Sequence, residues 1–126
     1  MSRRPVLVDS SIWIDHINHG HDILASLLKQ RRVLTHPLII GEIAMGSLKN
    51  RQKILREIGK LSGTKAVTNA EVMAMVEWDK LHNKGIGFID AHLLASVKIT
   101  ENATLLTKDG RLHAQAKRLG VAFAAA

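Results

Sequence analysis

The chain has 126 residues, of which 46% are hydrophobic, 3% are aromatic and none is cysteine. That length suits one compact domain, predicted over 1–126, and leaves no room for a second catalytic domain within it. The formal net charge of +7 favours a polyanionic partner such as nucleic acid or an anionic membrane surface. The lack of cysteine excludes a disulfide framework and a thiolate metal site, and it predicts a reducing, cytoplasmic location.

Apolar runs and turn residues divide the first half of the chain into two short strands and four helices. The strands are expected over 6–8 and 33–35. The helices are expected over 11–17, 23–32, 37–46 and 50–61. Pro37 suits the first turn of the third helix, and Asp9 ends the first strand abruptly. No apolar stretch reaches the roughly 18 uncharged residues of a membrane-spanning helix, so no membrane partner is expected.

The second half of the chain repeats the alternation of strands and helices. Strands are expected over 66–67, 104–107 and 121–123. Helices are expected over 68–83, 89–100 and 109–119. Thr68 and Glu71 have the spacing of a capping box at the start of the first of these helices. Short apolar strands between helices predict an α/β fold of three layers, with helices flanking a central parallel sheet of four to five strands.

Four acids fall where this topology places the functional edge of the sheet, because ligands gather at the carboxyl ends of parallel strands. Asp9 ends the first strand, and Asp109 follows the strand at 104–107. Asp90 begins a helix that leads back into that strand, which places its N-terminus at the same edge. Glu42 lies in the second turn of the helix that follows the second strand. We therefore expect one acidic site.

Clustered carboxylates of this kind suit phosphodiester hydrolysis with Mg²⁺, or with Mn²⁺ as a substitute. Both ions prefer carboxylate oxygens, and Mg²⁺ usually retains several water ligands. A bound ion lowers the pKa of its water, orients that water for in-line attack and offsets charge on the leaving oxygen. Divalent cations would also remove the repulsion between four acids and a phosphate backbone.

Each acid also has a structural explanation. Asp9 and Asp90 each suit the N-terminus of a helix, and Asp109 before Gly110 is ordinary turn chemistry. Glu42 lies among apolar residues, where a carboxylate needs a partner, so pairing with a nearby Lys or Arg is its alternative role. The convergence of all four acids on one edge favours a catalytic site over four separate structural roles.

Four stretches of the chain occur in the order and at the spacing of a known family. These are Val8 to Trp13, Gly41 to Gly46, Gly87 to Ala95 and Leu106 to Asp109. They resemble the PIN-domain ribonucleases, and specifically the VapC toxins of prokaryotic toxin–antitoxin pairs. The resemblance covers nearly the whole chain. Leu112 departs from it, since many relatives have Phe there, but this is a packing position and not a catalytic one.

The resemblance implies a PIN-like fold and a Mg²⁺- or Mn²⁺-dependent endoribonuclease. The family's acidic quartet falls on Asp9, Glu42, Asp90 and Asp109. In that family pattern Asp9 and Asp90 would be the firmest metal ligands, Glu42 would bind metal or orient water, and Asp109 would act directly or through water. Ser11 and Thr107 match hydroxyl positions that would support the acids. An RNA substrate, a homodimer and a small VapB-type antitoxin are also implied.

Basic residues supply candidate phosphate contacts. Lys108 and Arg111 flank Asp109 and are expected to contact RNA phosphates. The basic helix within 49–60 either borders an RNA groove or simply faces solvent.

The histidines near the N-terminus are not expected to bind metal. His16, His19 and His21 lack a second group of ligands and indicate an exposed turn. His92 follows Asp90 by two residues, so it is expected on a different side of the helix, packed or in solvent. Met73, Met75 and Trp78 are expected in the core or on a surface that meets a second copy or the antitoxin.

Other functions predict different sequence features. A nuclease acting on structured nucleic acid would need insertions to clamp a duplex, for which 126 residues leave little room. A phosphoacceptor signalling domain would need an acidic pair at the first strand, where this chain has Asp9 followed by two serines. A non-catalytic nucleic-acid-binding module gains nothing from four acids at the functional edge. These comparisons favour the metal-dependent ribonuclease toxin.

Overall fold

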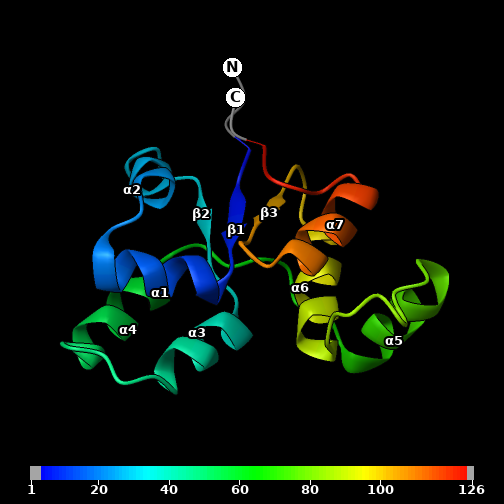
Figure 1. Ribbon diagram of the computed structural model, residues 1–126, viewed down its shortest axis with the longest axis horizontal. Coiled ribbons are helices and arrows are strands. Elements are labelled where there is room, and N and C mark those ends of the chain that lie inside the picture. Colours follow the sequence, from blue (N-terminus) through cyan, green and yellow to red (C-terminus); the bar gives the residue numbers. More distant parts are fainter. Residues whose placement is uncertain (1–3, 125–126) are drawn as a thin grey trace.

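A short parallel sheet lies at the centre of the protein, with helices on both sides of it (Figure 1). The computed structural model describes residues 4–124. The strands within that range are β1 (Val6–Val8), β2 (Val33–Leu34) and β3 (Thr104–Leu106), in the spatial order β2-β1-β3. The α/β class and the parallel sheet predicted from the sequence are confirmed.

Seven helices surround the sheet in the described part of the chain. They are α1 (Ser10–His19), α2 (Asp22–Lys29), α3 (Pro37–Ala44), α4 (Arg51–Gly59), α5 (Asn69–Trp78), α6 (Phe88–Ile99) and α7 (Gly110–Arg118). Figure 1 shows α1 to α4 on one side of the molecule and α5 to α7 on the other. No helix within residues 4–124 is long and apolar enough to cross a membrane.

The predicted number of strands is wrong. Within residues 4–124 the sheet has three strands, not four or five. The segment 66–67 is not a strand, because the chain beside β2 makes a single bridge, Thr35 to Gly63, and then leaves the sheet. The segment 121–123 is reduced to one bridge between Leu105 and Ala122. The two bridges, at Gly63 and Ala122, lie at the outer edges of the sheet, where a strand has a neighbour on one side only.

The helix boundaries follow local capping chemistry. Thr68 and Glu71 form the predicted capping box, in which Thr68 Oγ1 accepts from the Glu71 N–H and Glu71 Oε1 accepts from the Thr68 N–H. Helix α5 then ends at Trp78, five residues before the expected end, and the chain turns at Lys80 with a positive φ of 53°. Pro37 occupies the first turn of α3, as expected.

The core surrounds β1, whose three residues are completely buried. Its register pairs Leu7 with Leu34 of β2 and with Leu105 of β3. Leu112 is also fully buried, which agrees with its expected packing role. A strand enclosed on both faces and both edges holds its last residue firmly, and the residue that follows β1 is Asp9.

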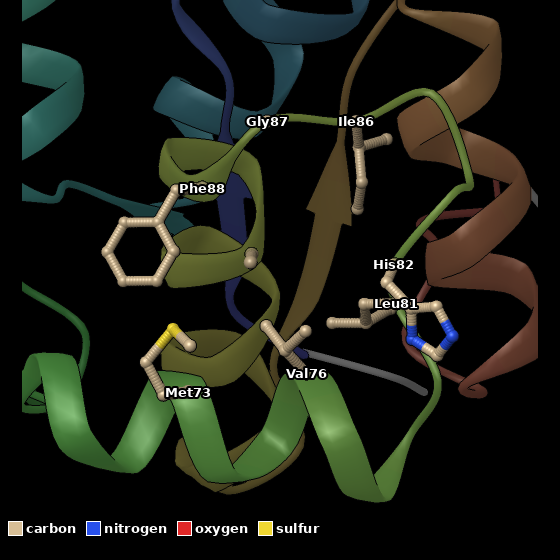
Figure 2. Close-up of a pocket in the computed structure, with 8 residues that line it drawn as sticks. Met73, Val76, Leu81, His82, Ile86, Gly87 and Phe88 are labelled. Atoms are coloured by element: carbon tan, nitrogen blue, oxygen red, sulfur yellow. The ribbon is translucent and has the colours of Figure 1, made fainter.

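A small apolar cavity of about 160 Å³ lies between α5 and the start of α6 (Figure 2). Val76 of α5 and Ile86 of the loop before α6 point into it, and Met73 and Phe88 lie at its side. Met73 and Phe88 are 52% and 43% exposed, and Trp78 is 83% exposed, so these side chains are surface residues and not core.

Candidate active site

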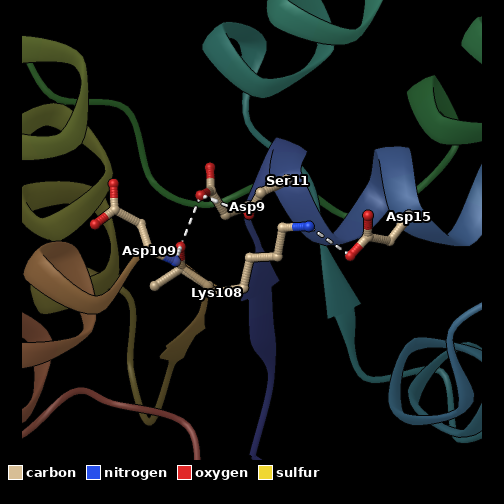
Figure 3. A network of polar contacts seen from close by, with 6 residues as sticks. Asp9, Ser11, Asp15, Lys108 and Asp109 are labelled. Carbon is tan, nitrogen blue, oxygen red and sulfur yellow. Dashed lines mark hydrogen bonds and ion pairs between the residues drawn. The ribbon is translucent and has the colours of Figure 1, made fainter.

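Asp9 lies at the carboxyl end of the central strand and is held by three hydrogen bonds (Figure 3). Its Oδ1 accepts from the Ser10 N–H at 2.8 Å, so Asp9 is the N-cap of α1. Its Oδ2 accepts from Ser11 Oγ at 3.2 Å and from Thr107 Oγ1 at 2.8 Å. The side chain is buried, with 8% of the residue exposed. Three hydrogen bonds hold the Asp9 carboxylate in one orientation, and among residues 4–124 it forms no ion pair with Lys or Arg, so it is a candidate metal ligand.

Glu42 faces the start of α1 from α3. Its Oε1 accepts from Ser10 Oγ at 3.3 Å. Although the residue is exposed, partial loss of hydration raises the pKa of the Glu42 carboxyl, the negative charge of Asp9 raises it further, and Asp90 adds to the effect. The hydrogen bond from Ser10 acts in the opposite direction. The expected alternative, an ion pair with Lys or Arg, is not formed among the described residues.

Asp90 is the third residue of α6, and its Oδ2 accepts from the Gly87 N–H at 3.1 Å. Burial raises the pKa of the Asp90 carboxyl, and the hydrogen bond from Gly87 lowers it. The charges of Asp9 and Asp109 then raise it again. Asp90 is therefore within electrostatic reach of the other two aspartates.

Asp109 caps α7 and is joined to Asp9 through one side chain. Its Oδ1 accepts from the N–H groups of Arg111 and Leu112 at 2.9 and 3.2 Å. Its own N–H donates to Thr107 Oγ1 at 3.1 Å, while the same hydroxyl donates to Asp9. The carboxyl groups of Asp9 and Asp109 point to the same side of the sheet edge (Figure 3).

The structure thus brings the four predicted acids to one edge of the sheet. Asp9 and Asp109 cap helices, as their structural explanations required, and Asp90 bonds the backbone at the start of α6. These roles do not compete with a site, because each carboxylate has a second oxygen or a further lone pair to offer. Desolvation is the largest cause of the raised pKa of both Glu42 and Asp90, and the negative charge of neighbouring acids raises both further, Asp9 and Asp90 for Glu42 and Asp9 and Asp109 for Asp90.

The chemistry of these donors fits a hard divalent cation. Carboxylate oxygens are the ligands that Mg²⁺ and Mn²⁺ prefer, and a cation would offset the repulsion between the carboxylates, which adds to the effect of desolvation on the two pKa values. Within residues 4–124, no three side chains of His, Cys, Asp or Glu stand close enough to enclose an ion directly. An ion held here would keep several water ligands, as Mg²⁺ usually does when one or two carboxylates bind it.

Lys108 and Arg111, the two predicted phosphate contacts, flank Asp109 but make different interactions. Lys108 Nζ is 2.8 Å from Asp15 Oδ2, in an exposed ion pair that crosses from the end of β3 to α1 (Figure 3). The hydrogen bond from Lys108 lowers the pKa of the Asp15 carboxyl. Arg111 packs its side chain against Gly85, where a Cβ would lie 2.6 Å from the arginine Cδ. Gly85 also has a φ of +78°, which favours glycine.

Two of the N-terminal histidines make hydrogen bonds where α1 meets α2. His16 Nδ1 accepts from the His21 N–H at 3.2 Å, and His21 Nδ1 accepts from the Leu24 N–H at 3.4 Å, which caps α2. His92 Nε2 lies 2.7 Å from Asn69 Oδ1, and its ring meets Phe88 edge to face. His92 is therefore packed against α5 and away from the acids.

One residue near the site was not predicted. His36 follows β2 and caps α3 with Nδ1, which accepts from the Leu38 N–H at 3.0 Å. Its Nε2 lies 3.1 Å from Ser96 Oγ in α6. Histidine immediately before Pro37 at a strand end was a usable signal for a cap, but nothing in the sequence indicated a partner 60 residues away.

Comparison with known proteins agrees with this geometry. The PIN domain family matches residues 6–118. Ribonuclease VapC32 of Mycobacterium tuberculosis, in strains CDC 1551 / Oshkosh and ATCC 25618 / H37Rv, is 40% identical over 119 residues. The alignment covers 94% of this chain and 96% of the relative. All four acids of the site lie within residues 6–118, which the family matches.

Proposed function

Since this chain belongs to the PIN-domain family, we propose that it is the ribonuclease toxin of a type II toxin–antitoxin pair, a VapC-type endoribonuclease. One PIN domain over 1–126 would carry the activity, although residues 1–3 and 125–126 lie outside the described part of the chain. The substrate would be RNA, cut by hydrolysis of phosphodiester bonds.

The observation that carries the proposal is the placement of the four acids at one sheet edge, with Asp9 capping the helix after β1, Asp109 capping the helix after β3, Glu42 bonded to Ser10 and Asp90 at the start of α6. Asp9 and Asp90 would bind the cation most directly, because both are at least partly buried and each accepts a hydrogen bond from a backbone N–H. Glu42 would bind metal or orient water, and Asp109 would act directly or through water. Ser11 and Thr107 would hold the Asp9 carboxylate in place.

The cofactor of this proposal is Mg²⁺, with Mn²⁺ as a substitute. When bound, such an ion supplies positive charge at the phosphate and lowers the pKa of water. The chain's own residues do the remaining work. Asp9, fixed by three donors, keeps its carboxyl group in one orientation, and the raised pKa of Glu42 makes it a better proton acceptor from water than an ordinary glutamate.

Partners and location follow from the same family assignment. We infer a VapB-type antitoxin as the cognate partner, a homodimer as the assembly and the cytoplasm as the site of action. Lys108 and Arg111 would contact RNA phosphates, which requires Lys108 to exchange Asp15 for the substrate. The exposed basic residues of 49–60 would extend this surface or remain solvated.

Replacement of Asp9 by Asn tests the proposal. Asp9→Asn keeps an acceptor for the Ser10 N–H but removes the charge, so Mg²⁺-dependent cleavage of a labelled single-stranded RNA should fall by at least about 100-fold. Asp22→Asn is the matched control, because Asp22 is an exposed acid in the first turn of α2. It should cut RNA like the wild type.

Three results would contradict the proposal. Cleavage of RNA by Asp9→Asn at the wild-type rate would remove the acidic site from the reaction. Cleavage of structured DNA in preference to RNA would point to a different nuclease. Tight RNA binding without any cleavage in Mg²⁺ or Mn²⁺ would identify a binding module.

A further inference from the structure

His36 occupies a buried position between the two helices that carry Glu42 and Asp90. Its ring is 6% exposed, and the side chain of Ser96 is completely buried. Nδ1 accepts from the Leu38 N–H at 3.0 Å, and Nε2 lies 3.1 Å from Ser96 Oγ. One imidazole thus bonds the first turn of α3 and the middle of α6.

These contacts determine the protonation state of the ring. Nδ1 receives a hydrogen bond from a backbone N–H, so that nitrogen carries no proton. A neutral imidazole then has its proton on Nε2, which donates to Ser96 Oγ. Burial lowers the pKa of His36, and the nearby His92 lowers it further, which agrees with the neutral form. A doubly protonated ring would lose the acceptor that caps α3.

The two helices otherwise belong to different parts of the molecule. Helix α3 packs on α1 and α4, whereas α6 packs on α5 and β3 (Figure 1). In the described part of the chain, no other hydrogen bond joins α6 to α3 or to its cap. A change at His36 therefore acts directly on the relative position of these helices.

His36 and Asp9 follow two strands that pair with each other, which makes this junction relevant to the acids. Leu7 pairs with Leu34 in the parallel ladder, so Asp9 and His36 follow at equivalent positions two residues beyond. Glu42 extends from the helix that His36 begins, and Asp90 from the helix that His36 bonds. The imidazole is therefore linked to two of the four acids, Glu42 and Asp90, through the helices that carry them.

We propose that His36 is a positioning residue of the acidic site, which fixes the start of α3 against α6 through Ser96 and so sets the spacing of Glu42 and Asp90. This inference rests on the proposed function. His36 itself touches neither the substrate nor the cation. It acts through the two helices, and of its two hydrogen bonds the one to Ser96 is the one that positions the acids.

Two substitutions separate the cap from the bond to Ser96. His36→Asn retains a short acceptor of the kind preferred at helix N-caps, but it is too short to reach Ser96. His36→Gln extends an amide N–H in the direction of Nε2 and should restore the bond. His21→Asn is the matched control, because His21 caps α2 through Nδ1 in the same way and α2 carries none of the four acids.

The measurement is Mn²⁺ binding without RNA, followed by electron paramagnetic resonance, together with kcat and KM for a labelled RNA. We expect His36→Asn to weaken Mn²⁺ binding about tenfold and to lower kcat with little change in KM. His36→Gln should recover most of the affinity, and His21→Asn should match the wild type. Ser96→Ala should reproduce His36→Asn, and it decides the case if His36→Asn does not fold.

The outcomes distinguish this inference from the proposed function. Wild-type Mn²⁺ affinity in His36→Asn or, if that variant does not fold, in Ser96→Ala, would overturn the positioning role while leaving the ribonuclease intact. An equal loss in His21→Asn would also overturn it, since helix capping in general would then be the cause. A wild-type protein that neither binds Mn²⁺ nor cuts RNA would refute the proposed function and this inference with it.

Discussion

Thr107 joins Asp9 to Asp109 through a single hydroxyl group. Its Oγ1 donates to Asp9 Oδ2 at 2.8 Å and accepts from the Asp109 N–H at 3.1 Å. One hydroxyl oxygen thus donates to one acid and accepts from the backbone of the other, and the two acids are 100 positions apart in the chain. The geometry of these acids depends on a residue that carries no charge.

Replacing Thr107 by Val should therefore impair cleavage more than folding. The substitution keeps the shape of the side chain but removes both hydrogen bonds, and we expect cleavage to fall about tenfold and the free energy of unfolding to fall by about 1–2 kcal/mol. Thr107→Ser should restore both. Thr104→Val, the same change at the buried start of β3, serves as the control in cleavage assays. Unaltered cleavage by Thr107→Val would show that Asp9 needs no hydroxyl partner.

Breaking the Lys108–Asp15 ion pair should strengthen RNA binding. Asp15→Asn frees Lys108 to contact an RNA phosphate. Because this adds roughly one phosphate contact, the affinity for a short RNA should rise about two- to threefold. Fluorescence anisotropy at low salt measures this affinity. The unfolding free energy should change by less than about 1 kcal/mol because the pair is exposed.

A matched control separates this contact from a general charge effect. Glu57→Gln makes the same change of net charge by breaking the exposed Lys60–Glu57 pair on α4. The gain from Asp15→Asn should vanish in a Lys108→Ala background. An equal gain from Glu57→Gln would mean that net charge, and not Lys108, controls affinity.

Stability should fall on mild acidification because of His36. The pKa of His36 is lowered in the folded protein, so the unfolded chain binds its proton first as the pH drops. This contribution to stability is complete at pH values above the ordinary histidine pKa of about 6.5. It is lost as the pH falls from there through the folded-state pKa, and the loss is about 1.4 kcal/mol for each unit by which folding lowers the pKa. Burial is the larger cause of the lowered pKa, and His92, which lines a cavity of about 320 Å³ together with His36, lowers it further.

The check is urea unfolding between pH 7.5 and 5. The wild type should lose stability over this interval, and His36→Asn should lose less, because its side chain does not titrate. Parallel curves for the two proteins would exclude His36 as the source of the pH dependence.

Neutralising Asp90 should stabilise the metal-free protein and abolish its response to Mg²⁺. The pKa values of Asp90 and Glu42 are raised, so the stability these groups contribute is present below their ordinary values near 4 and is lost as the pH rises through the folded-state values. Asp90→Asn removes one of the charges while an amide oxygen still accepts from the Gly87 N–H.

Thermal unfolding with and without Mg²⁺ measures this effect. At about 100 times its dissociation constant, Mg²⁺ should add about 2.7 kcal/mol to the wild type at pH 7 and much less at pH 4, where protons compete for the carboxylates. Asp90→Asn should melt higher than the wild type without metal and gain little from Mg²⁺. A lower melting temperature without metal would show that Asp90 stabilises the fold.

Local patterns were sufficient to predict most elements and the acids of the site. Asp9 follows a buried apolar run and Thr68 precedes Glu71 by three residues. The hydrogen bonds that these patterns predict join residues close in the chain, and they form as expected. The acids could be placed at one edge because the direction of each parallel strand follows from the alternation of strands and helices.

Contacts between distant side chains could not be predicted in this way. The partner of Lys108 is Asp15, 93 residues earlier, and the partner of His36 is Ser96, 60 residues later. Neither position has a local signal for the other. The segment at 66–67 has a strand-like composition, but pairing depends on whether the chain stays beside β2, and it leaves after Gly63. The fold class was therefore more predictable than the exact number of strands.

The bond between Asp9 and Thr107 also has a consequence for the order of folding. These two residues are separated by 98 positions, so their hydrogen bond closes a loop that spans most of the chain. The Asp9 carboxylate therefore takes up its final position only when β1 and β3 have paired, and a chain that has formed its local helices alone has no acidic site.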